Sequence, residues 1–168
     1  MRRGGLALAL ALTACGCGYR FVERASALPT DGQRVFAPTF KNDTSEAGLE
    51  VLVTDAFRAE LADAHVDGPE GSPVLAVGVV KALGGGPGQA FTRENGQVAS
   101  LASYHVDLGA CVRLTRGTKT LAATCVSGSA PYAPGADPLA GESARRVALN
   151  RLAQQLMQQA FERLSSAF

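Results

Sequence analysis

Apolar and polar residues alternate clearly between Val98 and Thr115, and this feature constrains the fold more than any other. Successive side chains of a β-strand point to opposite faces of a sheet, so the alternation predicts a strand with one buried face and one open face. A turn at 116–119 and a second strand over 119–129 should complete a hairpin. The expected buried face consists of Tyr104, Val106, Leu108, Ala110, Val112 and Leu114, and the open face of Ser103, His105, Asp107 and Arg113.

Two segments with helical periodicity could cover the buried face of this sheet. The first has its apolar positions between Leu49 and Leu61, should end near Ala64 or His65, and has Thr44 or Ser45 as its expected N-cap. The second should begin at Asp137, with Pro138 in the first helical position, a pair of residues typical of a helix start. Its apolar stripe, predicted to pack against the strands, consists of Leu149, Leu152, Ala153, Leu156, Met157, Ala160, Phe161 and Leu164.

Two further strands complete the predicted fold. Residues 33–40 are rich in β-forming side chains with Pro38 near the end, and 41–45 contain turn-forming residues. The continuous apolar run 73–80 predicts a central strand, and the glycines of 84–88 predict a flexible loop after it. We therefore expect an α+β fold in the order β-α-β-β-β-α, with two helices packed on one face of a mixed four-stranded sheet.

The N-terminus has the pattern of an export signal. Arg2 and Arg3 precede a short apolar stretch, 6–12, and small residues lead to Cys15. A membrane-spanning helix would need about 20 apolar residues, so this run is too short to cross a bilayer. One interpretation of this pattern is an ordinary secretory signal that is cut nearby, in which Cys15 has no special role; the other is a lipoprotein signal.

The tetrapeptide Leu12–Cys15 resembles the bacterial lipoprotein signal, in which the cysteine is acylated and becomes the new N-terminus. The resemblance implies a lipid anchor on Cys15 and, because Gly16 follows it, location at the periplasmic face of the outer membrane. Cys17 is the alternative acceptor, since small residues also precede it.

These features divide the chain into a lipoprotein signal peptide, 1–14, a lipidated tether, 15–32, and a single α+β domain, 33–168. Loss of Arg2 and Arg3 would lower the net charge from +1 to about −1. No surplus of positive charge then favours nucleic acid as a partner, and the absence of tryptophan argues against a platform for base stacking.

Cys111 and Cys125 lie inside the predicted domain, and an exported protein favours a disulfide between them. A two-residue turn between the strands would instead place Cys125 opposite Ala110, which does not favour the bond. The expectation of a disulfide therefore depends on export to an oxidising compartment and not on the predicted pairing of the strands. Two cysteines 14 positions apart without a nearby pair of histidines do not supply the four ligands of a zinc site, and we expect no metal.

No constellation of catalytic residues is evident in the sequence. His65 and His105 have no nucleophile at a recognisable spacing, and Gly84–Gly88 is not followed by the Lys-Ser/Thr of a phosphate-binding loop. The sequence therefore predicts a protein that is not an enzyme and needs no cofactor.

Three stretches, Cys17–Phe21, Val35–Thr44 and Gly48–Leu61, resemble the start of the lipopolysaccharide-assembly lipoprotein family, LptE. The second contains Phe-x-Asn-x-Thr at the end of the first strand. The element order of that family is the one expected above. The resemblance implies a lipoprotein that sits inside a large outer-membrane β-barrel, the lipopolysaccharide translocon, as plug and assembly partner. It would aid insertion of lipopolysaccharide into the outer leaflet without bond chemistry.

Exposed cations near strand ends are the candidates for contact with lipopolysaccharide or the barrel, although a solvated surface explains them equally well. The alternative function is that of an envelope lipoprotein that activates a peptidoglycan synthase or forms part of a secretion channel, because such proteins also begin with a strand, Phe-x-Asn-x-Thr and a helix. The candidate contacts are Lys81, Arg93, Arg113, Arg116 and Lys119.

Overall fold

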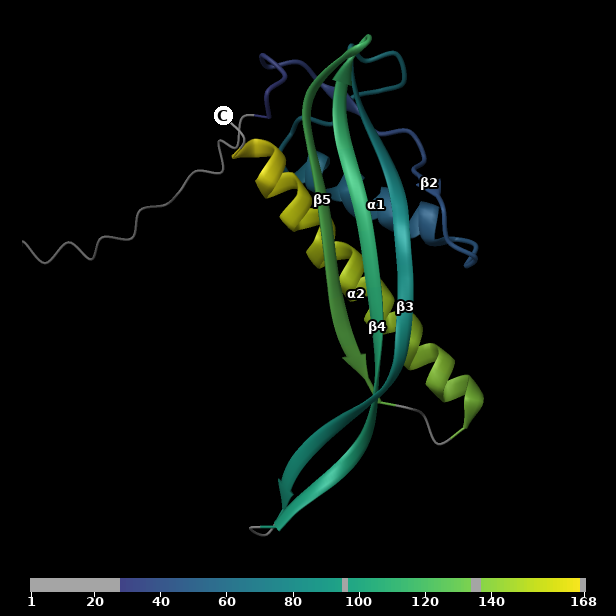
Figure 1. Cartoon of the computed structure of the whole chain (residues 1–168). Helices are drawn as coiled ribbons and strands as arrows, with labels where there is room; N and C mark the ends of the chain where they lie inside the picture. Colours follow the sequence, from purple (N-terminus) through teal and green to yellow (C-terminus); the bar gives the residue numbers. More distant parts are fainter. Residues whose placement is uncertain (1–27, 95–96, 134–136, 167–168) are drawn as a thin grey trace, which may run out of the picture.

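A computed structural model of the chain describes residues 28–94, 97–133 and 137–166. The predicted signal peptide and both proposed acylation sites, Cys15 and Cys17, lie outside these residues. Three long strands stand side by side, and both helices lie on the same side of them (Figure 1). The predicted α+β class and element order are confirmed.

The sheet is mixed. Its order is β1 (Val35–Phe36), β3 (Val74–Glu94), β4 (Gln97–Arg116) and β5 (Lys119–Tyr132), and β2 (Lys41–Asn42) also pairs with β3. β1 and β2 run parallel to β3, while β3, β4 and β5 are successively antiparallel. The parallel start follows from the helix between β2 and β3, because a crossover is needed to return the chain in the same direction.

The first predicted strand is interrupted. Only Val35–Phe36 and Lys41–Asn42 pair with β3, so 41–42 is strand and not the turn that the sequence suggested. Between them Pro38 has no N–H to donate to a ladder. The Phe40 N–H instead donates to Thr54 Oγ1 at 2.9 Å, which anchors this segment to the first helix.

Asn42 supports the turn that follows β2. Its side-chain oxygen accepts hydrogen bonds from the backbone N–H and the hydroxyl of Thr44, at 2.9 and 2.7 Å. Its amide donates to the Glu46 carbonyl and to Glu50 Oε2, at 2.7 and 2.8 Å. Asn and Thr of the Phe-x-Asn-x-Thr motif therefore brace the connection between β2 and the first helix.

The glycines of 84–88 do not form the predicted loop. They continue β3, and each pairs with a residue of β4, Gly85 with Val106 for example. A Cβ on Gly85 would lie 2.6 Å from the carbonyl oxygen of His105, so a residue without a side chain lets the two backbones approach closely here. Beyond Tyr104, where the pairing of β4 with β5 ends, β3 and β4 continue as a two-stranded ribbon that leaves the body of the protein (Figure 1).

The two helices are α1 (Leu49–Asp63) and α2 (Pro138–Ser165). Asp137 caps α2 as predicted, because its carboxylate accepts the Ala140 N–H at 2.9 Å. The expected cap of α1 by Thr44 or Ser45 is wrong. Gly48, with φ 94°, occupies that position, and the Glu50 carboxylate accepts its N–H at 3.2 Å.

The core lies between the helices and the inner face of the sheet. All eight residues of the predicted α2 stripe are buried, as are the inner-face residues of β4 except Tyr104, which is 37% exposed at the end of the body. Leu28 and Thr30 are also buried, so this part of the expected tether packs against the domain. The helices cover only one face of the sheet, and the other face is left open.

Candidate functional site on the open face of the sheet

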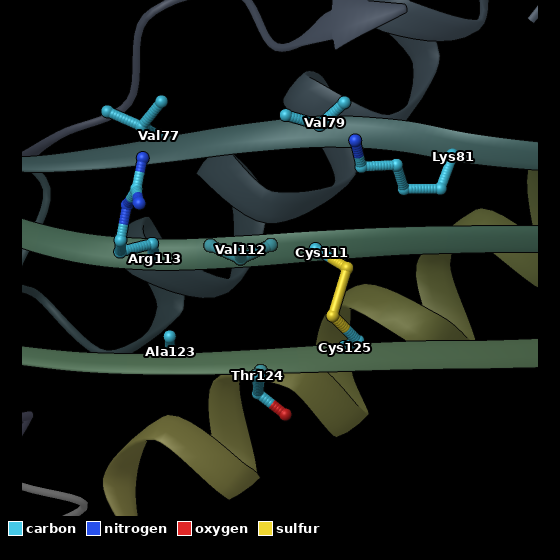
Figure 2. Close-up of a pocket in the computed structure, with 9 residues that line it drawn as sticks. All are labelled: Val77, Val79, Lys81, Cys111, Val112, Arg113, Ala123, Thr124 and Cys125. Atoms are coloured by element: carbon cyan, nitrogen blue, oxygen red, sulfur yellow. A yellow bond between two sulfur atoms is a disulfide. The ribbon is translucent and has the colours of Figure 1, made fainter. Parts of the chain in front are cut away.

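The open face carries a hollow of about 430 Å³ at the middle of the body. We call it the open-face hollow, and Figure 2 shows the residues around it. It crosses three strands, with a floor that is mainly apolar and two cationic side chains. Its lining is Val77, Val79 and Lys81 of β3, Cys111, Val112 and Arg113 of β4, and Ala123, Thr124 and Cys125 of β5.

Strand register brings these residues together. Val79 pairs with Cys111, and Cys111 pairs with Cys125, so one row crosses the three strands. Arg113 stands in the next row, where it pairs with Val77 and Ala123. The apolar run of β3 places valines on both faces of the strand. The valines on the open face, Val77 and Val79, form the floor of the open-face hollow. The sequence pattern did not identify them as part of a site.

Cys111 and Cys125 are joined by a disulfide. The register conflict noted in the sequence is resolved by a bulge: Thr115 pairs with Thr120, whereas Leu114 pairs with Ala122. This single-residue shift moves Cys125 from opposite Ala110 to opposite Cys111. The burial of Ala122, Val126 and Ala130, on the same face as Leu114, is consistent with the register that the bulge sets.

The two cations of the open-face hollow differ in their partners. Lys81, the extra residue of a bulge in β3, donates to Asp43 Oδ2 at 3.0 Å. Lys41 also contacts Asp43, at 2.8 Å. Hydrogen bonds from Lys41 and Lys81 hold the pKa of Asp43 below its ordinary value, and the same carboxylate raises the pKa of Lys41. Arg113 has no ion-pair or hydrogen-bond partner within the part of the chain that the structure describes.

The remaining predicted contacts lie elsewhere. Arg116 is engaged at the end of the sheet, where it donates to Asp31 Oδ2 and to the Thr30 carbonyl, both at 3.0 Å. Lys119 is exposed beside the hairpin turn. Arg93 is near the end of β3 in the protruding ribbon, and the structure describes its backbone but not its side chain. The structure therefore groups Lys81 with Arg113 and separates them from the other three cations.

The described residues show neither a metal-binding cluster nor a membrane-spanning helix. No group of three or more His, Cys, Asp or Glu residues in 28–94, 97–133 and 137–166 is arranged to hold a metal ion. Neither α1 nor α2 is long and apolar enough to span a membrane, among the helices described.

These observations define a two-layer α+β domain that closes its core with two helices and leaves one sheet face open for contact. The lipopolysaccharide-assembly family model, LptE, matches residues 32–164. The chain belongs to this family. No curated protein matches the sequence.

The solved structures that resemble this chain are distant in sequence. A candidate lipoprotein from Caulobacter crescentus CB15 is 15% identical with a TM-score of 0.51, over 76% of this chain and 89% of that one. A hypothetical protein from Chlamydia trachomatis is 10% identical with a TM-score of 0.50, over 79% and 96%. Rare lipoprotein B from Shewanella oneidensis is 13% identical with a TM-score of 0.44, over 79% and 95%. At these identities, the similarity to the proteins from Caulobacter crescentus and Chlamydia trachomatis supports a shared fold and nothing about function.

Proposed function

We propose that this chain is an acyl-anchored lipoprotein of the outer membrane, facing the periplasm, and acts as plug and assembly partner of the β-barrel lipopolysaccharide translocon. In this role it aids insertion of lipopolysaccharide into the outer leaflet and catalyses no bond chemistry on the lipopolysaccharide. The observation that carries the proposal is the family match over 32–164, which includes every described strand, α1, and all of α2 except its last residue.

The chemistry of the open-face hollow suits an anionic amphiphile. Lipopolysaccharide combines phosphate groups with acyl chains, and the hollow combines an apolar floor with Arg113 and Lys81 at its side. An arginine can bind a phosphate through two parallel hydrogen bonds, and Arg113 has no protein partner among the described residues to compete. We therefore assign the contact with lipopolysaccharide to Arg113 and Lys81. Arg116 is assigned a structural role, because it already binds Asp31 and Thr30.

Partner recovery tests the docking role. The tagged chain is purified from detergent-solubilised outer membrane of its own host, and we expect a large β-barrel in stoichiometric amount. Recovery of a peptidoglycan synthase or of secretion-channel subunits without that barrel would contradict the proposal and favour the alternative function.

Site-specific crosslinking tests the contact face. A photoreactive amino acid replaces Val79 at the open-face hollow and, as the matched control, Leu139, an apolar residue of α2 that is 82% exposed. Ultraviolet light should join lipopolysaccharide to position 79 and leave position 139 without adducts. Equal labelling at the two positions would show that the open face is not selective for this ligand.

Labelling with a palmitate analogue tests the anchor. A Cys15→Ala variant should lose the label, whereas Cys17→Ala should keep it. The opposite result would assign the acyl chains to Cys17, and retention of the label in a double variant would refute the anchor at either position.

A further inference from the structure

The Cys111–Cys125 disulfide lies on the outside of the sheet rather than in the core. Cys125 is exposed and Cys111 is half-buried, and both sulfur atoms border the open-face hollow (Figure 2). Structural disulfides that resist reduction are usually shielded, whereas exposed ones are open to attack by thiols. The position of this bond therefore allows chemistry that a purely structural bridge would not undergo.

Contacts other than the disulfide fix both cysteine residues. Cys111 is in the middle strand, paired with Val79 on its other side, and its chain neighbours Ala110 and Val112 are buried. At Cys125 the backbone carbonyl accepts a hydrogen bond from Arg163 Nη1 of α2 at 3.0 Å. The strand pairing extends on both sides of the bond, so opening it leaves the fold in place and the two sulfur atoms close together.

We infer that Cys111–Cys125 is a thiol–disulfide exchange site that oxidises an external dithiol while the domain stays folded. A thiolate of the dithiol attacks Cys125 Sγ, forming a mixed disulfide as the bond between the two cysteines breaks, and the electron pair leaves on Cys111 Sγ. The second thiol of the dithiol, after losing its proton, attacks the first sulfur of the dithiol in the mixed disulfide and releases Cys125 as thiolate; both cysteine thiolates then take up protons. The dithiol loses two electrons and two protons, and the two cysteines gain them.

Exposure and charge set the direction of attack. Cys125 is the more exposed residue and so receives the incoming thiolate, while Cys111 leaves. Three cations, Lys41, Lys81 and Arg113, and one carboxylate, Asp43, surround this part of the open face. The surplus of positive charge stabilises a departing thiolate and attracts an anionic attacking one. Arg113 contributes most freely, because no described carboxylate neutralises it.

Reduction of the folded protein is the first test. The full acylated chain, oxidised and held in detergent at pH 7.5, is treated with dithiothreitol at about 1 mM, and samples are quenched with acid, alkylated and mapped by mass spectrometry. We expect Cys111 and Cys125 to become alkylated within minutes while the far-ultraviolet circular dichroism stays constant. Exchange of the reductant for oxidised glutathione, which accepts the two electrons, should restore the bond. A bond that resists until denaturant is added, or a loss of structure in step with reduction, would overturn the inference.

The second test identifies the attacked sulfur. The oxidised chain is treated with glutathione, a monothiol, and the mixed disulfide is located by mass spectrometry. Glutathione should be found mainly on Cys125. An equal distribution, or a preference for Cys111, would refute the proposed direction.

Charge reversal provides the third test. Arg113→Glu should slow reduction by glutathione about three- to tenfold, because a negative charge replaces a positive one on the same face of the sheet, two residues from Cys111. Lys119→Glu is the matched control, with the same charge change at the hairpin turn away from the disulfide, and should change the rate less than twofold. Equal rates for the two variants would rule out a role of Arg113 in exchange. Recovery of the barrel and crosslinking to lipopolysaccharide are read separately, so failure of the exchange would leave the proposed function intact.

Discussion

Gly78 allows β3 to pass beneath an aromatic ring of the core, and a substitution there should be severe. A Cβ at this position would lie 2.2 Å from Cδ2 of Phe40 and 2.3 Å from two further ring atoms. Ordinary van der Waals contact begins near 3.4 Å, so a methyl group at Gly78 overlaps the ring by more than 1 Å. Gly78→Ala therefore requires the ring or the strand to move.

The surroundings oppose either movement. Phe40 is 3% exposed, and its ring centroid lies 5.8 Å from that of Phe57, which is fully buried. Its backbone N–H is held by Thr54, and β3 is paired on both sides near Gly78. Overpacking a well-filled core costs about 1–3 kcal/mol, and the size of the overlap places Gly78→Ala near the upper end.

Urea unfolding followed by circular dichroism measures this effect. A loss of about 3 kcal/mol at a slope of about 2 kcal/mol/M lowers the midpoint by about 1.5 M. Gly109→Ala is the matched control, because its Cβ would meet atoms no closer than 3.5 Å. That variant should stay within about 1 kcal/mol of the parent protein.

A double-mutant cycle tests the reasoning itself. Phe40→Ala alone should cost about 3–5 kcal/mol, because it removes a buried ring. With the ring absent, Gly78→Ala should cost little more, so the two effects would fall short of additivity by about 2–3 kcal/mol. Additive effects, or a Gly78→Ala protein as stable as the parent, would refute the proposed clash.

Three further predictions concern hydrogen bonds and one ion pair. Thr54→Val should lower the free energy of unfolding by about 1–3 kcal/mol, since it leaves the buried Phe40 N–H without an acceptor, whereas Thr54→Ser should restore most of it. Asp137→Ala removes the cap of α2 and should cost about 1 kcal/mol in the same urea assay, and Asp137→Asn should cost much less. The Glu46 carboxylate binds Arg145, and this hydrogen bond lowers the pKa of Glu46 in the folded state. Its stabilisation is therefore present above the unfolded pKa of Glu46 and is lost as pH falls through the lower folded value. Glu46→Gln should make stability less dependent on pH in that acidic window, and an unchanged pH profile would count against the pair.

Regular periodicity predicted the parts of this fold that are repetitive. The α2 stripe and the two faces of β4 follow from spacing alone, because burial repeats every 3.6 residues in the helix and every second residue in the strand. Periodicity did not predict that Gly84–Gly88 is part of a strand. Glycine is common in loops, and its place in β3 is decided by the backbone of β4 opposite it. The predicted cap of α1 was wrong because a local contact competes for it: the Thr44 hydroxyl, which was expected to cap the helix, donates a hydrogen bond to Asn42 Oδ1.

The candidate site depends on two irregularities that no periodic pattern contains. A bulge at Lys81 gives β3 one residue with no partner on β4, and a bulge after Leu114 shifts β5 by one position. Since strand side chains repeat with period two, the second shift decides whether Cys125 and Cys111 share a face. Without it the cysteines would lie on opposite faces, the disulfide could not form, and the row from Val79 to Cys125 would not exist. The sequence could identify the cysteines and the cations separately, but their meeting in the open-face hollow follows from how the strands are aligned.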